Sequence, residues 1–362
     1  MKLQITQENL NKALGNVARV ASSRNTLPIL SNILIKTIDN RVAISATNLN
    51  IAITHYIGSK VSEEGAITVP ARLMQDFISS LPNEIININV DETKLHIKTN
   101  SFNSTINGTP ADDYPIMPKI KNGKKWQISA SGLKKALSQV VICASSDETR
   151  PVLTGVFFHT IKDELFVVAT DSYRLAEKKV DKINQDISLL IPASAIADLL
   201  RIIDDSHDVV KVECDENQVL FSVGDVELVT RLIDGNYPDY KKLIPAKFST
   251  SATLAKNELQ NITKVSSLFA RESAGSVTIE VSEENQEISI QSIASQLGEN
   301  TSKSKAKVSG GGKITLNSKY LLDALSVISD NEVSVSFNEK LDPSVVSGTD
   351  KNYVHIIMPL KS

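Results

Sequence analysis

The chain has little cysteine, few aromatic residues and no long hydrophobic run. Its 362 residues include two cysteines, one tryptophan and 5% aromatic residues in all. Cys143 and Cys214 lie in apolar runs, which predicts reduced core thiols of a cytosolic protein rather than a disulfide framework. The N-terminal residues Met1–Glu8 lack an apolar signal core, and no stretch approaches the roughly 18 apolar residues of a membrane span. We therefore expect a cytoplasmic protein without membrane contact.

Motifs for catalysis and for cofactor binding are also missing. The sequence has neither the phosphate-binding P-loop nor the glycine pattern of a dinucleotide fold, and Gly310–Gly312 follows a Lys/Ser tract. Five histidines are widely scattered, and none has a second ligand at metal-binding spacing. The acidic pair Asp112–Asp113 adjoins a turn, where capping of the backbone is the favoured interpretation. We predict no catalytic residue, no metal and no cofactor.

Positive charge is not in excess. The chain has 39 Lys and Arg against 42 Asp and Glu, a net charge of −3, whereas a conventional nucleic-acid-binding domain is basic. An acidic total does not exclude DNA binding, because what matters is whether the basic residues share one face.

What the chain does contain is a threefold repeat. Landmarks of the first copy recur in the second in the same order, 122 or 123 residues later: Leu10 and Leu133, Pro28 and Pro151, Ala46 and Ala169, Pro70 and Pro192, Tyr114 and Tyr237. A third, weaker copy aligns residues 314–317 with residues 189–192, an offset of 125 residues. This period far exceeds that of solenoid repeats, so each copy is the size of a domain.

Each copy predicts two helices and several alternating strands. Apolar residues at the i, i+3, i+4, i+7 spacing of a helix with one buried face form two stripes per copy. The first stripes are Leu10, Ala13, Leu14, Val17; Leu133, Ala136, Leu137, Val140; and a weaker Leu259, Ile262, Thr263, Ser266. The second are Met74, Phe77, Ile78, Leu81; Ile196, Leu199, Leu200, Ile203; and Leu321, Ala324, Leu325, Ile328. Pro70 and Pro192 precede helices, where a missing N–H costs little. Two helices on one side of a sheet predict an α+β domain.

Polar stretches at residues 119–125 and 245–251 indicate the joins between copies. Residues 300–312 contain three lysines and three consecutive glycines, which predicts a long flexible loop inside the third copy.

Basic residues concentrate on the predicted helices or just after them. They include Lys12, Arg24 and Arg72 in copy one, and Lys134, Lys135 and Arg150 in copy two. Acidic residues gather in loops, so helices that point one way would give one basic surface. For any single residue, a solvated helix face is an equally good explanation.

The segment Ala169–Ala176, with Asp171, Ser172, Tyr173 and Arg174, has the richest chemistry. A strand-to-turn junction is the favoured structural interpretation, but copy one builds the same junction without an arginine. That difference favours a function for Arg174.

These motifs resemble those of the bacterial DNA polymerase III beta subunit, the sliding-clamp family, over nearly the whole chain. The resemblance rests on the repeat and on residues 27–30, 151–155, 169–176, 236–240, 320–325 and 358–360. It implies an α+β DNA-clamp fold of three similar domains, 1–121, 126–245 and 248–362, each with two helices packed on antiparallel sheet. It further implies a head-to-tail, ring-shaped homodimer with pseudo-sixfold symmetry.

The resemblance also implies a function and partners. It describes a processivity factor that encircles double-stranded DNA without sequence specificity and tethers the replicative polymerase alpha subunit, the clamp-loader complex and other clamp-motif proteins. A groove between domains two and three is expected to receive their peptides. Its matching positions are Leu153, Thr170, Ser172, Tyr173, Arg174, Leu175, Pro245, Leu341, Ser344, Ile356, Met358, Pro359 and Leu360. DNA contacts match Arg24, Arg72 and Arg150, with Lys12, Lys134 and Lys135 as further candidates, and the protomer interface matches Ile106 and Leu268.

The chain departs from the family pattern in places. Tyr173 replaces a common histidine, the tail ends in Lys361–Ser362, and Lys303, Lys305 and Lys307 stand where an acidic segment is expected. Two alternatives remain open from the residues alone. One is an enzyme on duplicated domains that uses Asp171 and Arg174, and the other is a monomeric peptide-binding scaffold without a DNA role.

Overall fold

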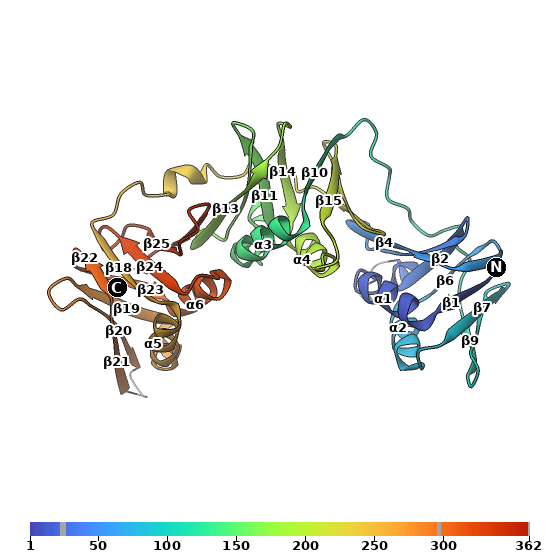
Figure 1. Ribbon diagram of the computed structural model, residues 1–362, viewed down its shortest axis with the longest axis horizontal. Helices are drawn as coiled ribbons and strands as arrows, with labels where there is room; N and C mark the ends of the chain where they lie inside the picture. The colour runs from blue at the N-terminus through green and yellow to red at the C-terminus, as the bar shows by residue number, and fades with distance from the viewer. Residues whose placement is uncertain (22–26, 295–297, 361–362) are drawn as a thin grey trace. The chain divides into compact units, whose positions relative to one another are not determined.

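A computed structural model describes residues 1–21, 27–294 and 298–360 (Figure 1). The chain divides into two compact units. The first unit contains residues 1–131 and 194–232, and the second contains residues 132–193 and 233–362. Each unit therefore combines one terminal copy of the repeat with part of the middle copy.

The first unit contains two sheets. The larger has the strand order β10-β15-β16-β17-β4-β3-β2-β6, and the smaller has the order β5-β1-β7-β8-β9. The strands of the larger sheet are β2 Asn32–Ile38, β3 Arg41–Thr47, β4 Ile51–Gly58, β6 Ala66–Pro70, β10 Lys124–Ser129, β15 Val209–Cys214, β16 Gln218–Val223 and β17 Val226–Arg231. Those of the smaller are β1 Lys2–Thr6, β5 Lys60–Glu63, β7 Ile85–Asp91, β8 Lys94–Lys98 and β9 Asn103–Asn107.

The second unit also contains two sheets, ordered β14-β11-β12-β13-β26-β25-β24-β18-β22 and β21-β20-β19-β23. The strands of the larger sheet are β11 Gly155–Ile161, β12 Glu164–Thr170, β13 Arg174–Lys182, β14 Ser188–Pro192, β18 Thr250–Ala255, β22 Lys307–Ser309, β24 Glu332–Phe337, β25 Ser344–Ser347 and β26 Tyr353–Ile357. Those of the smaller are β19 Ser276–Ser282, β20 Glu287–Ala294, β21 Gly298–Lys305 and β23 Gly312–Asn317. Neighbouring strands pair antiparallel in all four sheets.

Six helices form where the apolar stripes predict them within the described residues. They are α1 Gln7–Val17, α2 Ala71–Ser80, α3 Ala130–Val140, α4 Ala193–Ile202, α5 Lys256–Phe269 and α6 Ser318–Val327. Thr6 begins α1, with its hydroxyl accepting from the Asn9 N–H at 3.4 Å, and the Asn317 side chain caps α6 in the same way. In the first unit α1 packs beside α2, and in the second α5 packs beside α6 (Figure 1).

The predicted stripes are buried with few exceptions. All four apolar residues of the first stripe in copies one and two are at most 1% exposed, and Thr263 and Ser266 are buried on α5. Three members lie only half-buried: Phe77, Leu200 and Ile262. The fold therefore follows the helical periodicity of the sequence closely.

Each large sheet runs across a join between two copies of the repeat. In the first unit β17 pairs with β4, with Leu228 opposite Ile53. In the second unit β13 pairs with β26, with Ala176 opposite His355. The repeats are therefore joined by backbone hydrogen bonds as well as by the connecting segments.

The prediction of a flexible loop at residues 300–312 is wrong. Strand β21 covers Gly298–Lys305 and pairs with β20, and β22 and β23 occupy most of the remainder. Polar contacts hold both faces of β21: the Asn300 amide donates to the Ser266 hydroxyl at 2.9 Å, and the Lys303 ammonium pairs with the Glu287 carboxylate at 2.9 Å. Because the strand is polar on both faces, hydrophobic alternation could not reveal it.

The prediction that both cysteines are free thiols in the core is confirmed. Cys143 and Cys214 are buried free thiols. No helix in the described part of the chain is long and apolar enough to cross a bilayer. Strands β10 and β18 begin at Lys124 and Thr250, so each predicted join is shorter by two residues than its polar stretch.

Candidate functional site

The turn between β12 and β13, in the second unit, is built by its own side chains. The Asp171 carboxylate accepts from the N–H groups of Tyr173 and Arg174, both at 2.9 Å. The Thr170 hydroxyl accepts from the Ser172 N–H at 3.1 Å and donates to the Arg174 carbonyl at 2.6 Å. Ser172 adopts a φ of 77°, which is uncommon for a residue with a side chain. The segment is thus a structural junction, in agreement with the interpretation that the sequence favoured.

Arg174 ties this turn to helix α6. Its Nε donates to Asp171 at 3.0 Å and its Nη1 donates to Asp323 at 2.6 Å, while the guanidinium lies 4.5 Å from the centroid of the Tyr320 ring. The side chain is only 10% exposed. Desolvation lowers the pKa of Arg174, but the hydrogen bond to Asp323 and the charge of Asp171 outweigh it and raise the pKa. Arg174 is a fixed, paired cation.

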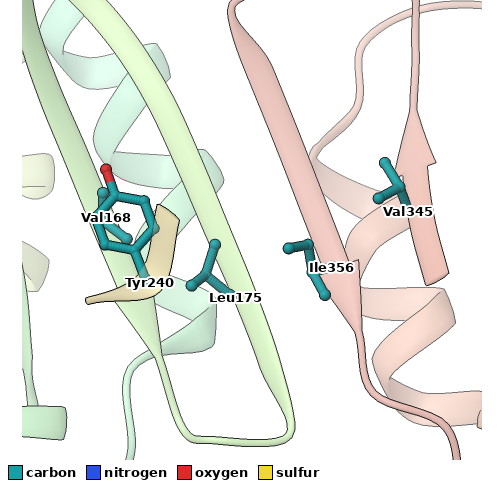
Figure 2. Packing of buried hydrophobic residues seen from close by; sticks show 5 residues of the cluster. All are labelled: Val168, Leu175, Tyr240, Val345 and Ile356. Carbon is teal, nitrogen blue, oxygen red and sulfur yellow. The ribbon is translucent and has the colours of Figure 1, made fainter. Parts of the chain in front are cut away.

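An apolar cluster lies where the sheet crosses from β13 to β26. It comprises Val168, Leu175, Tyr240, Val345 and Ile356. Leu175 and Ile356 lie opposite each other on the neighbouring strands β13 and β26, so their side chains project from the same face of the sheet (Figure 2). Tyr240 comes from the short helix η4, Tyr240–Leu243, in the segment that connects two copies. Phe157, Tyr237, Ile244, Val354 and Met358 pack against it half-buried.

The connecting segment is held on this cluster by polar groups. The Tyr240 hydroxyl lies 2.8 Å from His159 Nε2 and donates to the Glu177 carboxylate, which also pairs with Lys241. The Lys241 ammonium lies 4.3 Å from the centroid of the Phe166 ring. Burial lowers the pKa of His159 to about 4, so the ring is neutral near pH 7.

The chain's last residues return to the same turn. The Met358 N–H donates to the Tyr173 carbonyl and the Leu360 N–H to the Thr315 carbonyl, both at 2.8 Å. Tyr173 is 61% exposed, whereas Met358, Pro359 and Leu360 are half-buried. The tail therefore forms a fixed border beside an exposed tyrosine.

The structure brings many of the predicted groove residues together. Thr170, Ser172 and Arg174 share the turn, Leu175 and Ile356 share the apolar cluster, and Met358 contacts both. Pro245 follows Ile244 in the connecting segment, half-buried. Leu153 and Ser344 are buried, the Ser344 hydroxyl donating to the Ile357 carbonyl at 2.9 Å, and Leu341 is 60% exposed in the loop before β25.

Sequence reasoning missed the partners of these residues. Tyr320 and Asp323 belong to the motif at residues 320–325, yet only the fold shows that they hold Arg174. The role of Tyr240 and Ile244 in the apolar cluster was likewise not inferred, although both lie close to a predicted join. Arg150, expected on DNA, donates from Nη1 to the Ser172 hydroxyl at 3.0 Å and so borders the turn.

Four of the other candidate DNA contacts lie on helices. Arg72 on α2 has a side chain 96% exposed and is 3.9 Å from Asp76, while Lys12 on α1 is 3.4 Å from Asp204. On α3, Lys135 is exposed 3.9 Å from Asp350, and Lys134 is half-buried. Such long or exposed ion pairs are weak and easily exchanged. Arg24 lies outside the described residues.

The two candidate interface residues differ in exposure. Ile106 on β9 is 6% exposed, and Leu268 on α5 is 50% exposed. Strands β9 and β21 each end a sheet, so each leaves one backbone edge unpaired within its own sheet. No cluster of three or more His, Cys, Asp or Glu suited to a metal occurs within residues 1–21, 27–294 and 298–360.

The chain is similar to known proteins over its whole length. Family models of the DNA polymerase III beta subunit match the N-terminal domain at residues 1–118, the central domain at 127–239 and the C-terminal domain at 241–361. The beta sliding clamps of Staphylococcus aureus and Staphylococcus epidermidis are each 30% identical over the full length of both chains.

Solved structures agree with these matches. The sliding clamp from Bacillus subtilis is 31% identical with a TM-score of 0.94, covering 100% of this chain and 99% of that one. The Bartonella birtlesii clamp bound to griselimycin is 27% identical with a TM-score of 0.95 and complete coverage of both. The predicted α+β clamp fold is thereby confirmed.

The ion pairs of Arg174 should be energetically coupled. We expect Arg174→Ala to reduce the free energy of unfolding by about 1–3 kcal/mol, because it leaves the partly buried Asp323 carboxylate without its ion-pair partner and removes one of the hydrogen bonds to Asp171. Asp323→Ala should cost less, and the double variant should fall short of the sum by roughly 1 kcal/mol or more. Urea denaturation measures each value. Arg150→Ala, on the exposed side of the same turn, is the control, and strict additivity would contradict the coupling.

Proposed function

This chain belongs to the DNA polymerase III beta subunit family, and from that premise we infer that it is a sliding clamp, a non-catalytic processivity factor of DNA replication. The full-length match to all three family models carries this conclusion. Family membership sets aside the enzyme alternative, in which Asp171 and Arg174 were site residues. Those two residues instead pair with each other in the turn beside the proposed groove.

Weak charge contacts suit such a role. Binding to DNA through phosphates alone typically has a Kd of roughly 10⁻⁴ to 10⁻⁶ M at physiological salt, enough to guide sliding but not to retain DNA for long. A closed ring retains duplex DNA because it encloses the DNA, so high affinity is not required. A chain with a net negative charge can therefore act as a clamp with only a few exposed cations, such as Arg72, facing the DNA. The proposed DNA contacts are Arg24, Arg72, Arg150, Lys12, Lys134 and Lys135.

We propose that two protomers close the ring head to tail. The edge strand β9 of one protomer would pair with the edge strand β21 of its partner and extend the sheet across the interface. Exposed apolar side chains flank both edges, with Phe102 (44% exposed) before β9 and Leu268 on α5, which packs against β21. Buried Ile106 on β9 would hold that edge strand in place by packing against the core of its own protomer. The three-domain division at 1–121, 126–245 and 248–362 remains part of this proposal.

We propose that the groove of the second unit receives short peptides from the polymerase and other clamp-binding proteins. Half-buried Met358, which packs on the core residues Leu175 and Ile356, would provide an apolar floor, and exposed Tyr173 and Leu341 would provide further apolar surface. Arg174 acts as a positioning residue, because its donors to Asp171 and Asp323 fix the turn that forms the border. Arg150 is the more exposed cation beside that turn.

The proposed role also predicts a further partner and a cellular location. A closed ring must be opened to admit DNA, so a clamp loader is expected among the partners. The role also places the protein in the bacterial cytoplasm, on the nucleoid. The monomeric scaffold remains the alternative, and the oligomeric state together with retention on DNA distinguishes the two.

Retention on circular DNA tests the ring directly. Loaded by a clamp loader onto a nicked circular plasmid, the protein should co-elute with the DNA in gel filtration and be lost when the plasmid is cut once. Leu268→Asp should prevent retention by placing a charge in the proposed interface, whereas Lys60→Ala, an exposed change on β5, should not. A monomer by sedimentation at micromolar concentration, with equal retention on linear DNA, would support the scaffold instead.

The salt dependence of duplex binding tests the proposed phosphate contacts. Arg24→Ala and Arg72→Ala together should reduce the slope of log K against log salt concentration by about 0.9 for each phosphate that is no longer neutralised. Fluorescence anisotropy with a labelled duplex measures this slope. Arg231→Ala, an exposed arginine at the end of β17, serves as the control, and an unchanged slope would remove Arg24 and Arg72 from the DNA surface.

Griselimycin is bound to the Bartonella birtlesii clamp, and we propose that in this chain it would occupy the groove. We expect the full chain to bind it, and deletion of residues 358–362 to abolish binding in calorimetry while sedimentation still shows a dimer, because the tail borders the groove. Lys351→Ala, exposed before β26, is the control. Undiminished affinity after the deletion would refute the placement of the groove.

A further inference from the structure

A hollow of about 540 Å³ lies within the first unit. It is bounded by one face of the large sheet, formed by β2, β3, β4, β16 and β17, and by the connecting segment 114–120. Its floor is mostly small or apolar, with Ala43, Ala52, Leu220 and Val229 among the lining residues. This volume is that of a typical small-molecule site, which is concave and mainly apolar with a few polar groups.

The internal repeat shows what this hollow corresponds to. The offset of 123 residues relates β3 and β4 to β12 and β13, and segment 114–120 to the segment that contains Tyr240. The strand registers extend the match. Val229 lies opposite Ala52 as Ile356 lies opposite Leu175, and Leu220 lies opposite Val229 as Val345 lies opposite Ile356. The apolar cluster of the second unit thus has five counterparts, and all five line the hollow: Ser45 for Val168, Ala52 for Leu175, Met117 for Tyr240, Leu220 for Val345 and Val229 for Ile356.

The hollow exists because its side chains are smaller. Serine replaces valine, alanine replaces leucine, methionine replaces tyrosine, and Ala43 stands where Phe166 stands in the second unit. Protein interiors normally leave few voids larger than a water molecule. What is missing here includes the rings of Phe166 and Tyr240, so the hollow is suited to an aromatic ligand.

Polar groups line the part of the hollow that corresponds to the position of the Tyr240 phenol in the second unit. In the second unit the Tyr240 hydroxyl contacts His159 and Glu177. Their counterparts are Lys36 and Thr54, and both line the hollow. The Thr54 hydroxyl lies 2.9 Å from that of Ser45, and the Lys36 ammonium has no hydrogen-bond or ion-pair partner within the described part of the chain.

The charges of the lining support an electron-rich occupant. Of the two glutamates there, Glu227 accepts from the Tyr56 hydroxyl at 3.0 Å and Glu213 pairs with Lys125 at 3.1 Å. Two lysines, Lys36 and Lys119, also line the hollow, and both are exposed. Lys119 belongs to the connecting segment, whereas Lys36 lies opposite Ala43 on the neighbouring strand, so the Lys36 ammonium is the cation beside the sheet floor that a ligand can complement. A phenol offers it both an oxygen and a ring face, as Phe166 offers its ring to Lys241 in the second unit.

We propose that this hollow binds a free small aromatic molecule that carries a phenolic hydroxyl. The aromatic ring of the ligand occupies the space above Ala43 and Ala52, and its phenolic oxygen forms hydrogen bonds with the Lys36 ammonium and the Thr54 hydroxyl. The site is independent of the peptide groove and of the DNA contacts, and its test does not depend on either.

The test uses 4-methylphenol, which is the tyrosine side chain itself. The full-length protein, with labelled alanine and methionine methyl groups, should show saturable NMR shifts at Ala43, Ala52 and Met117. Ala43→Phe, which restores the residue of the other copy, should weaken binding about tenfold or more, because it fills the space of the ring. Lys36→Met should weaken it about threefold or more. Toluene, which lacks the oxygen, should bind more weakly than 4-methylphenol and be insensitive to Lys36→Met.

Controls separate this site from others. Lys60→Met, an exposed lysine on β5 outside the hollow, should leave the affinity unchanged, and Ala52→Leu replaces Ala43→Phe if that variant does not fold. The proposal is overturned if no shifts appear up to the solubility limit of the probe. It is also overturned if shifts occur at Met358 alone, or if the filled variant binds as tightly as the parent chain.

Discussion

The structure depends on antiparallel strand pairing that continues across the joins between repeats. At both joins a strand of the middle copy pairs with a strand of a terminal copy, β17 with β4 and β13 with β26. Because a row of backbone hydrogen bonds fixes the register of both partners, each join is as precise as the interior of a sheet. The two compact units therefore divide the middle copy between them.

Precise joins explain why binding features gather there. A connecting segment must cross each join, and the face that it covers is lined by residues of two copies. In the second unit large side chains fill that face, and the border formed by the Arg174 turn and the C-terminal tail carries the proposed peptide groove. In the first unit smaller residues leave a hollow on the equivalent face. The two units thus share the same strand arrangement at the join, and the size of a few side chains decides whether this face is filled or hollow.

Much of the fold was predictable because it depends on periodicity. The six helices follow apolar stripes such as Leu10–Val17, and these stripes are the part of a sequence that burial constrains most strongly. Strand β21 escaped prediction because polar contacts hold both of its faces, so its sequence resembles a loop. The site was predicted only as a set of positions: comparison of the copies indicated that the turn does not need Arg174, but the link from Arg174 to Asp323 joins residues 149 positions apart. Long-range pairing of that kind leaves no local pattern.

The charge of the chain follows from the way a clamp retains DNA. A protein that holds DNA by affinity needs many phosphate contacts and becomes strongly basic. A ring that holds DNA by enclosure needs only contacts weak enough to exchange as it slides, and each additional cation would slow that exchange. Lys12 and Arg72, two of the proposed DNA contacts, have exposed and loosely paired side chains, as such exchange requires. The net charge of −3, which would count against a conventional DNA-binding domain, is therefore compatible with a protein whose affinity for DNA is limited by its function.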